Sequence, residues 1–272
     1  MKRLWIVLLC CLPLHVWAQT YQSIAEKAID YTQKDSLIQA EKLYKQAIAL
    51  EPNNEKNLLL YCNLGLVQRK MGHFADAADS YTFALKLQPS SVAILQKRAA
   101  VYIDGHYDTD AMKDYDEILT LQPDNKQALL VRAFLYGKQK NYVKAGADYN
   151  HLILLEPNNY EAHLGLAILE EKQQNYRKSM EMLNELISQY PNNATLYLAR
   201  ANVEVEITEP EMALIDVERS IALDAKSADA FILRGDIYLK MKKKTLARQN
   251  FLRALKLGAT AGELKERIEK CK

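Results

Sequence analysis

The sequence is poor in the residues and motifs from which catalytic and metal sites are built. It has four cysteines, nine glycines and seven prolines among 272 residues. It contains no nucleophile elbow, phosphate-binding loop, paired-cysteine motif or HExxH motif. We therefore expect a protein that is not an enzyme and that uses no cofactor. His73 and His106 raise the question of a metal pair, but the sequence favours no metal site.

Long apolar runs are also scarce, with one exception at the N-terminus. Leu4–Leu14 is apolar almost throughout, follows Lys2 and Arg3, and is followed by a small residue at Ala18. A run of about 11 residues is shorter than the roughly 20 that span a bilayer. We interpret residues 1–18 as a secretory signal peptide and residues 19–272 as one exported domain, periplasmic or associated with the cell envelope and without a transmembrane segment. The alternative is an uncleaved N-terminal anchor.

The net charge and the cysteines of the mature chain, residues 19–272, argue against a nucleic-acid-binding protein and against a disulfide-rich one. Removing residues 1–18 takes away two of the 36 basic residues and none of the 34 acidic ones, which leaves a net charge of zero. A neutral chain argues against a nucleic-acid-binding protein, because such affinity depends on neutralising phosphates. The remaining cysteines, Cys62 and Cys271, lie near opposite ends of the chain and form no disulfide framework.

The chain does contain a regular spacing of prolines. Pro89, Pro123, Pro157 and Pro191 are each 34 residues apart, whereas Pro52 precedes Pro89 by 37. A fixed period of this length indicates a repeat architecture. With proline at position 32, the repeats are 21–54, 58–91, 92–125, 126–159, 160–193, 194–227 and 228–261, with residues 55–57 between the first two.

Other positions of the repeat support this alignment. Position 8 is always Ala or Gly, position 20 is Ala or Ser, and position 24 is Tyr, Leu, Val or Phe. Within a repeat, apolar residues recur three and four apart, which predicts two amphipathic helices of about 14 residues each. Proline cannot continue the second helix, and the polar residue after it can cap the next helix.

These residues resemble the tetratricopeptide repeat family. The resemblance rests on a small residue at position 8, Tyr at 11, Ala at 20, an aromatic residue at 24, a small residue at 27 and Pro at 32. The last two repeats depart from it, with Ala225 and Ala259 in place of the proline. The resemblance implies an all-α, right-handed α-solenoid of seven helix-turn-helix repeats, and we expect residues 262–272 to form a C-terminal cap helix.

The resemblance also implies that first-helix positions 2, 5, 9, 12 and 13 face a concave groove. In the two middle repeats, an apolar floor with polar rims suits an extended peptide or an amphipathic helix. The alternative is that these residues only pack against the next first helix. The groove candidates are Gln127, Leu130, Phe134, Lys138, Glu161, Leu164, Ile168, Glu171 and Lys172.

Arginine recurs at position 7 and predicts structural ion pairs. Where it is present, position 23 is Asp in three repeats and Asn in the fourth, which has Arg234. We infer a bridge between the two helices of one hairpin and not a row of anion-binding arginines. The predicted pairs are Arg98–Asp114, Arg132–Asp148 and Arg200–Asp216.

The last repeat is strongly basic. Repeat 228–261 sums to +6, whereas repeats 92–125 and 194–227 each sum to −4. The simplest interpretation is a solvated edge. The alternatives are a contact with acidic partners or anionic lipid headgroups of the envelope, and head-to-tail contact with an acidic repeat of another copy. The basic patch consists of Lys240, Lys242, Lys243 and Lys244.

Together these features predict a non-catalytic, exported scaffold or adaptor. We expect it to bind a protein or peptide in its groove, within a cell-envelope assembly, and to bind no nucleic acid. Two other interpretations remain open: a binding protein for a cell-wall or polysaccharide fragment, and a self-assembling structural element.

Overall fold

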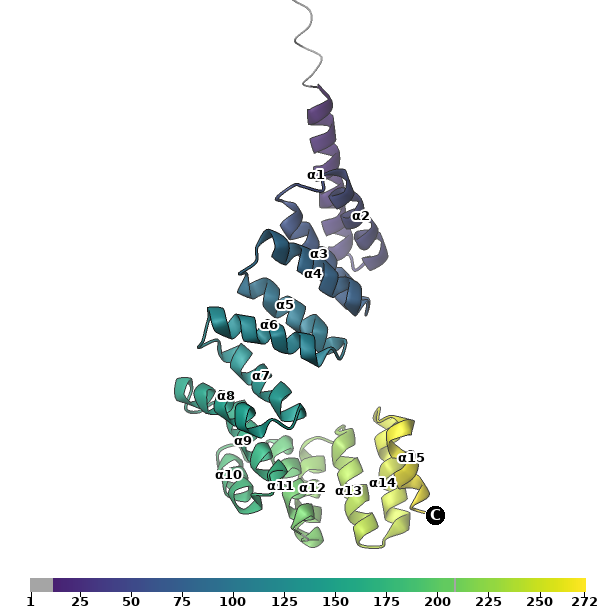
Figure 1. The fold of residues 1–272 in the computed structure, drawn as a ribbon. Helices are drawn as coiled ribbons and strands as arrows, with labels where there is room; N and C mark the ends of the chain where they lie inside the picture. The colour runs from purple at the N-terminus through teal and green to yellow at the C-terminus, as the bar shows by residue number, and fades with distance from the viewer. Residues whose placement is uncertain (1–11, 208) are drawn as a thin grey trace, which may run out of the picture. The chain divides into compact units, whose positions relative to one another are not determined.

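A computed structural model describes residues 12–207 and 209–272, and in these ranges the chain is helical with no strand (Figure 1). The predicted signal peptide lies partly outside these ranges, and its residues 12–18 are helical. The helices are α1 (Leu12–Gln33), α2 (Leu37–Leu50), α3 (Asn57–Lys70), α4 (Phe74–Leu87), α5 (Val92–Asp104), α6 (Asp108–Leu121), α7 (Lys126–Lys138), α8 (Tyr142–Leu155), α9 (Tyr160–Lys172), α10 (Tyr176–Gln189), α11 (Ala194–Glu206), α12 (Pro210–Leu223), α13 (Ala228–Lys240), α14 (Lys244–Lys256) and α15 (Ala261–Glu269).

The helices belong to two compact units, which divide within α7 after Arg132. Each unit is a row of helical hairpins (Figure 1). In the first unit α1 packs on α2, α3 on α4 and α5 on α6, and the second helices α2 and α4 also contact the next first helices, α3 and α5. The second unit repeats this pattern from α9 to α14, and α15 packs on α14. The all-α repeat prediction is therefore confirmed.

Helix boundaries follow the proline period. Most second helices end two residues before position 32, as α4 does at Leu87 and α8 at Leu155. The polar residue at position 34 then caps the next helix: Asn125 accepts from the backbone N–H of Ala128 at 3.0 Å, and Asn159 accepts from that of Ala162 at 2.9 Å. Two boundaries differ slightly from the predicted ones: α3 begins at Asn57 and not at residue 58, and the cap helix covers Ala261–Glu269 and not residues 262–272.

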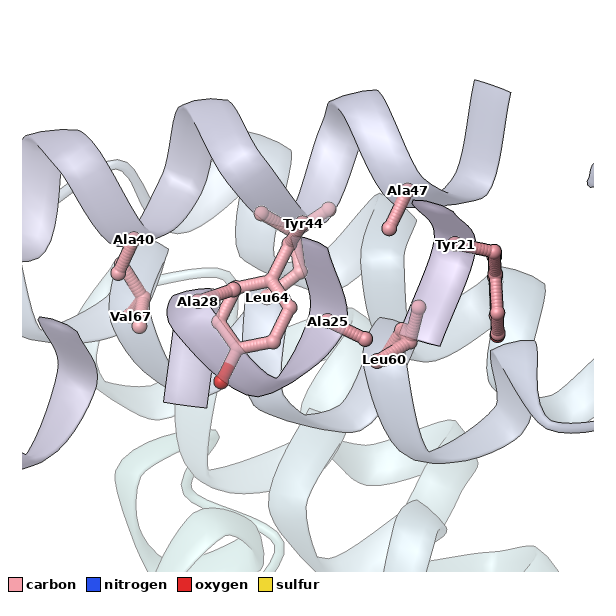
Figure 2. Packing of buried hydrophobic residues seen from close by; sticks show 9 residues of the cluster. All are labelled: Tyr21, Ala25, Ala28, Ala40, Tyr44, Ala47, Leu60, Leu64 and Val67. Carbon is pink, nitrogen blue, oxygen red and sulfur yellow. The ribbon is translucent and has the colours of Figure 1, made fainter. Parts of the chain in front are cut away.

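Small residues hold the two helices of each hairpin close together. Ala28 at position 8 and Ala40 at position 20 are fully buried, and the ring of Tyr44 at position 24 lies beside them in the same cluster (Figure 2). The Tyr44 hydroxyl is satisfied by Thr32 Oγ1 at 3.1 Å. The same arrangement leaves little room in the last hairpin, since a Cβ on Gly235 at position 8 of α13 would lie 2.4 Å from Cε1 of Phe251 on α14.

The turn between the two helices of a hairpin has one backbone geometry throughout the described repeats. Position 15 has positive φ at Asp35, Gly72, His106, Lys140, Gln174 and Lys242. The next N–H donates to the carbonyl oxygen five residues back, for example from His73 to Gln68 at 2.9 Å and from Asn175 to Glu170 at 2.8 Å. This bond completes a helix C-cap in which the residue at position 15 has the left-handed backbone conformation. The turn is therefore set by the backbone, because among these residues only Gly72 adopts positive φ without steric cost.

The arginines at position 7 join three helices. Arg98 donates from Nε and Nη2 to both carboxylate oxygens of Asp114, at 3.0 and 2.6 Å. Its Nη1 reaches back to Thr82 Oγ1 of the preceding hairpin at 2.9 Å. Arg200 likewise holds Asp216 at 2.6 and 2.8 Å, and donates to Asn184 of the preceding hairpin at 2.7 Å. The arginines thus also bridge between repeats, a role that the sequence does not predict.

The other two arginines differ in their partners. Arg234 donates to Asn250 Oδ1 at 2.8 Å within its own hairpin. In the first unit, Arg132 donates to Asp116 of the preceding hairpin at 2.8 Å. The predicted Arg132–Asp148 pair joins residues of the two units and stays a prediction.

A buried carboxyl group lies one helical turn beyond Arg200. The side chain of Glu204 is buried, and its Oε2 has no hydrogen-bond partner among the described residues. The pKa of Glu204 is raised to about 7, chiefly by burial and also by the nearby Asp216 carboxylate, while Arg200 opposes the rise. Glu204 therefore titrates close to neutral pH.

A matched pair of glycine substitutions tests the close helix crossing within a hairpin. Gly235→Ala in α13 should lower the free energy of unfolding by about 1–3 kcal/mol, because the buried ring of Phe251 in α14 must move. Gly146→Ala, in α8 with open space around its Cβ, should raise it by up to about 1 kcal/mol through helix propensity. Urea unfolding of both variants measures the difference. Equal effects would contradict the packing described.

Removing one carboxylate tests the arginine bridges. Asp114→Ala should cost about 3 kcal/mol of stability, because Arg98 loses a bidentate partner whose side chain is only 3% exposed. Glu181→Ala, which removes an exposed pair with Arg177, should change stability little. The comparison uses urea midpoints, and similar losses in both variants would show that the bridge does not stabilise the hairpin.

Glu204 predicts a pH-dependent stability. Its pKa in the folded state lies above its ordinary value, so its contribution to stability is complete at low pH and is lost as pH rises through about 7. Glu204→Gln should match the parent near pH 5 and be more stable by about 1–3 kcal/mol at pH 8. Melting temperatures from pH 5 to 8 measure this trend, and a constant difference across the range would contradict it.

Candidate functional site

Three first helices have an exposed apolar side chain at position 9, whereas Ile29 at this position of α1 is half-buried against a core cluster. In the second unit, Phe134 of α7 is 56% exposed and Ile168 of α9 is 38% exposed. In the first unit, Leu66 occupies the same position on α3 and is 40% exposed. Because the hairpin core is formed by other faces of these helices, position 9 has no partner to cover it within its own hairpin.

The other groove candidates differ in exposure. Leu164 of α9 is half-buried and packs against a core cluster that includes Ala167 and Leu196, so it contributes to packing. Glu171 is half-buried and pairs with Lys172 at 3.0 Å. The exposed rim residues of the second unit are Lys138, Glu161 and Lys172.

Two of the candidates belong to the first unit. Gln127 is exposed and Leu130 is half-buried, and both precede the division within α7. In the second unit the remaining part of α7 lies against α9, since a Cβ on Gly137 would be 3.5 Å from Leu169. Phe134 and Ile168 are therefore exposed on helices that pack together.

A cleft in the first unit was missed by sequence reasoning. It has a volume of about 470 Å³ and lies between α1 and α3, where Ala25, Ile29, Leu58 and Leu59 supply apolar surface. Leu59 is 59% exposed. The three extra residues between the first two repeats lie at one end of this cleft, where Glu55 and Lys56 line it. The sequence shows these three extra residues as the 37-residue spacing of Pro52 and Pro89, which exceeds the usual 34.

Buried polar residues fix the end of this cleft. Asn57, fully buried, accepts from the Tyr21 hydroxyl at 2.9 Å and donates to the Glu51 carbonyl at 2.6 Å. These bonds tie α1 to the segment before α3.

Further along α3, burial raises the pKa of the Cys62 thiol, so the thiol is protonated at neutral pH.

The predicted basic patch lies at the turn between α13 and α14. Lys242, Lys243 and Lys244 are exposed. Lys240 is also exposed, and its ammonium group donates to the Val205 carbonyl oxygen at 3.0 Å, which ties α13 to the preceding hairpin. The exposed patch therefore centres on the three turn lysines.

No helix within residues 12–207 and 209–272 has the length and hydropathy to cross a membrane. Both cysteines in these ranges, Cys62 and Cys271, are free thiols.

Comparisons with curated proteins give a partial match. The chain is 39% identical over 66 residues to DnaJ homolog subfamily C member 7 of Mus musculus, and to the same degree to that of Homo sapiens. The match covers 24% of this chain and 13% of each relative. It therefore concerns a short segment of a much longer protein.

Solved structures match over most of the chain. A tetratricopeptide repeat protein from Parabacteroides merdae is 32% identical, with a TM-score of 0.85, over 93% of this chain and 99% of that one. YrrB, described as a tetratricopeptide repeat protein with an unusual peptide-binding site, is 18% identical with a TM-score of 0.53, over 74% and 97%. The second likeness concerns the fold alone.

Family comparison agrees with the hairpin pattern and with the first of these structures. Residues 62–125, 138–203 and 228–257 each match a family described as tetratricopeptide repeat. This chain belongs to the tetratricopeptide repeat family.

Proposed function

We propose that this protein is a non-catalytic scaffold that binds a protein or peptide partner on the exposed faces of its first helices. The observation that carries the proposal is the exposure of Phe134 and Ile168 at equivalent positions of α7 and α9. Exposed apolar side chains that recur on neighbouring helices suit the anchors of a bound segment.

The surroundings of these residues support the same partner chemistry. Lys138, Lys172 and Glu161 supply both signs of charge around the apolar pair, as in the polar rim of an interface. YrrB, with the same fold, is described as having a peptide-binding site. A bound peptide would place apolar side chains on Phe134 and Ile168 and its polar groups against the rim.

We further propose that the scaffold is exported and works in a cell-envelope assembly. The support is the N-terminal sequence, with Lys2 and Arg3 before an apolar run that ends near Ala18. In that setting the exposed lysines Lys242, Lys243 and Lys244 would contact anionic envelope lipids or an acidic partner.

A pull-down with charged variants tests the binding surface. Phe134→Glu combined with Ile168→Glu should reduce capture of the partner by at least about thirtyfold, because one interface anchor contributes about 2 kcal/mol or more. The matched control combines Val143→Glu with Leu154→Glu on α8, where both side chains are more exposed, at 83% and 82%. The control should capture the partner as the parent does.

The assay is a crosslinking pull-down from cell-envelope extract, with captured proteins identified by mass spectrometry and helicity of each variant checked by circular dichroism. Loss of one protein with the α7/α9 variant alone supports the proposal. Equal capture by all three proteins, or loss with the α8 control, would overturn it.

A further inference from the structure

Three potential metal ligands from two different hairpins meet in the first unit. They are Glu41 of α2, His73 in the turn before α4, and Asp76 in the first turn of α4. One ligand atom from each side chain lies within 4.8 Å of the other two. Glu41 is half-buried, whereas His73 and Asp76 are exposed, so the cluster is open to solvent on one side.

The backbone holds His73 and Asp76 in place. His73 follows Gly72, whose φ is 78°, and its N–H donates to the Gln68 carbonyl at 2.9 Å. Its own carbonyl accepts from the Ala77 N–H at 3.0 Å, so His73 caps α4. Asp76 follows three residues later, which places both side chains at the same end of the helix.

Buried polar residues orient Glu41. The side chain of Gln68 is 2% exposed and that of Ser80 is 5% exposed. Ser80 Oγ donates to Gln68 Oε1 at 2.6 Å, which directs Gln68 Nε2 to Glu41 Oε1 at 3.1 Å. Such a chain of hydrogen bonds behind a carboxylate is what fixes a ligand in a metal site. Position 11 is Gln and position 23 is Ser only in this repeat.

We propose that Glu41, His73 and Asp76 bind a divalent transition-metal cation of the Zn²⁺ class. One imidazole nitrogen with two carboxylate oxygens suits borderline cations such as Zn²⁺, Co²⁺ and Ni²⁺, whereas Ca²⁺ and Mg²⁺ take oxygen ligands. Three protein ligands leave a coordination position for water. Lys45, which contacts Glu41 Oε1 at 2.8 Å, is 57% exposed and can turn into solvent when the cation binds.

The bound cation would join two repeats. Glu41 belongs to the first hairpin and the other two ligands to the second, so the cation cross-links them. Each repeat of a solenoid is stabilised mainly by its neighbours. A metal that binds the folded state alone therefore stabilises this junction. The sequence does not predict this site, because the site depends on the packing of α2 against the second hairpin. Only the three-residue spacing of His73 and Asp76 is visible in the sequence.

Two measurements on the full, chelator-treated chain test the proposal: isothermal titration calorimetry with Zn²⁺, and the melting temperature with and without Zn²⁺. The parent should bind one Zn²⁺ per chain and melt at a higher temperature with Zn²⁺ than without, and Mg²⁺ should have neither effect. His73→Asn should weaken Zn²⁺ binding by at least about tenfold and abolish the thermal shift. Asn keeps a side chain able to cap α4.

The matched control is His106→Asn, in the corresponding turn of the next hairpin. Asn tolerates the positive φ of this residue, 61°, so its fold should be unaffected. This variant should bind Zn²⁺ like the parent. Asp76→Asn is a second variant, nearly equal in size to the original, and should weaken binding as His73→Asn does. Binding that survives both ligand substitutions, or that is lost in the control, would overturn the proposal, as would a parent that binds no Zn²⁺.

Discussion

The close crossing of two helices within each hairpin is the constraint on which the rest of the structure depends. It requires small residues where the helices meet, such as Ala28 and Ala40, and a large side chain such as Tyr44 beside them. Because this crossing buries one face of the first helix, position 9 is directed away from the hairpin core. The exposure of Phe134 and Ile168 is thus a consequence of how the hairpin closes.

Most of the fold could be predicted because its determinants recur along the chain. Proline spacing, small residues at positions 8 and 20, and polar caps such as Asn159 each act through local backbone or packing effects. The turn geometry could not be predicted, since His106, Lys140 and Gln174 share positive φ but no common chemistry. There the hydrogen bond that closes the helix end imposes the conformation, and the side chain only tolerates it.

The candidate site was predictable only in part, for related reasons. The exposed position of Phe134 follows from the repeat register, whereas the packing of Leu164 against a core cluster depends on neighbouring helices. The backward reach of Arg98 to Thr82 depends on how successive hairpins pack. So does the approach of Glu41 to His73. Contacts within a repeat can be recognised from its periodic positions, whereas contacts between hairpins also depend on how one hairpin packs on the next.

The proposed function places the partner on the first helices and leaves the second helices free. A photo-crosslinking amino acid inserted at position 134, and separately at position 143 of α8, tests this directly in living cells. The account predicts a crosslinked partner from position 134 and none from position 143, with both chains folded. A crosslink from position 143 alone, or the same partner from both positions, would contradict it.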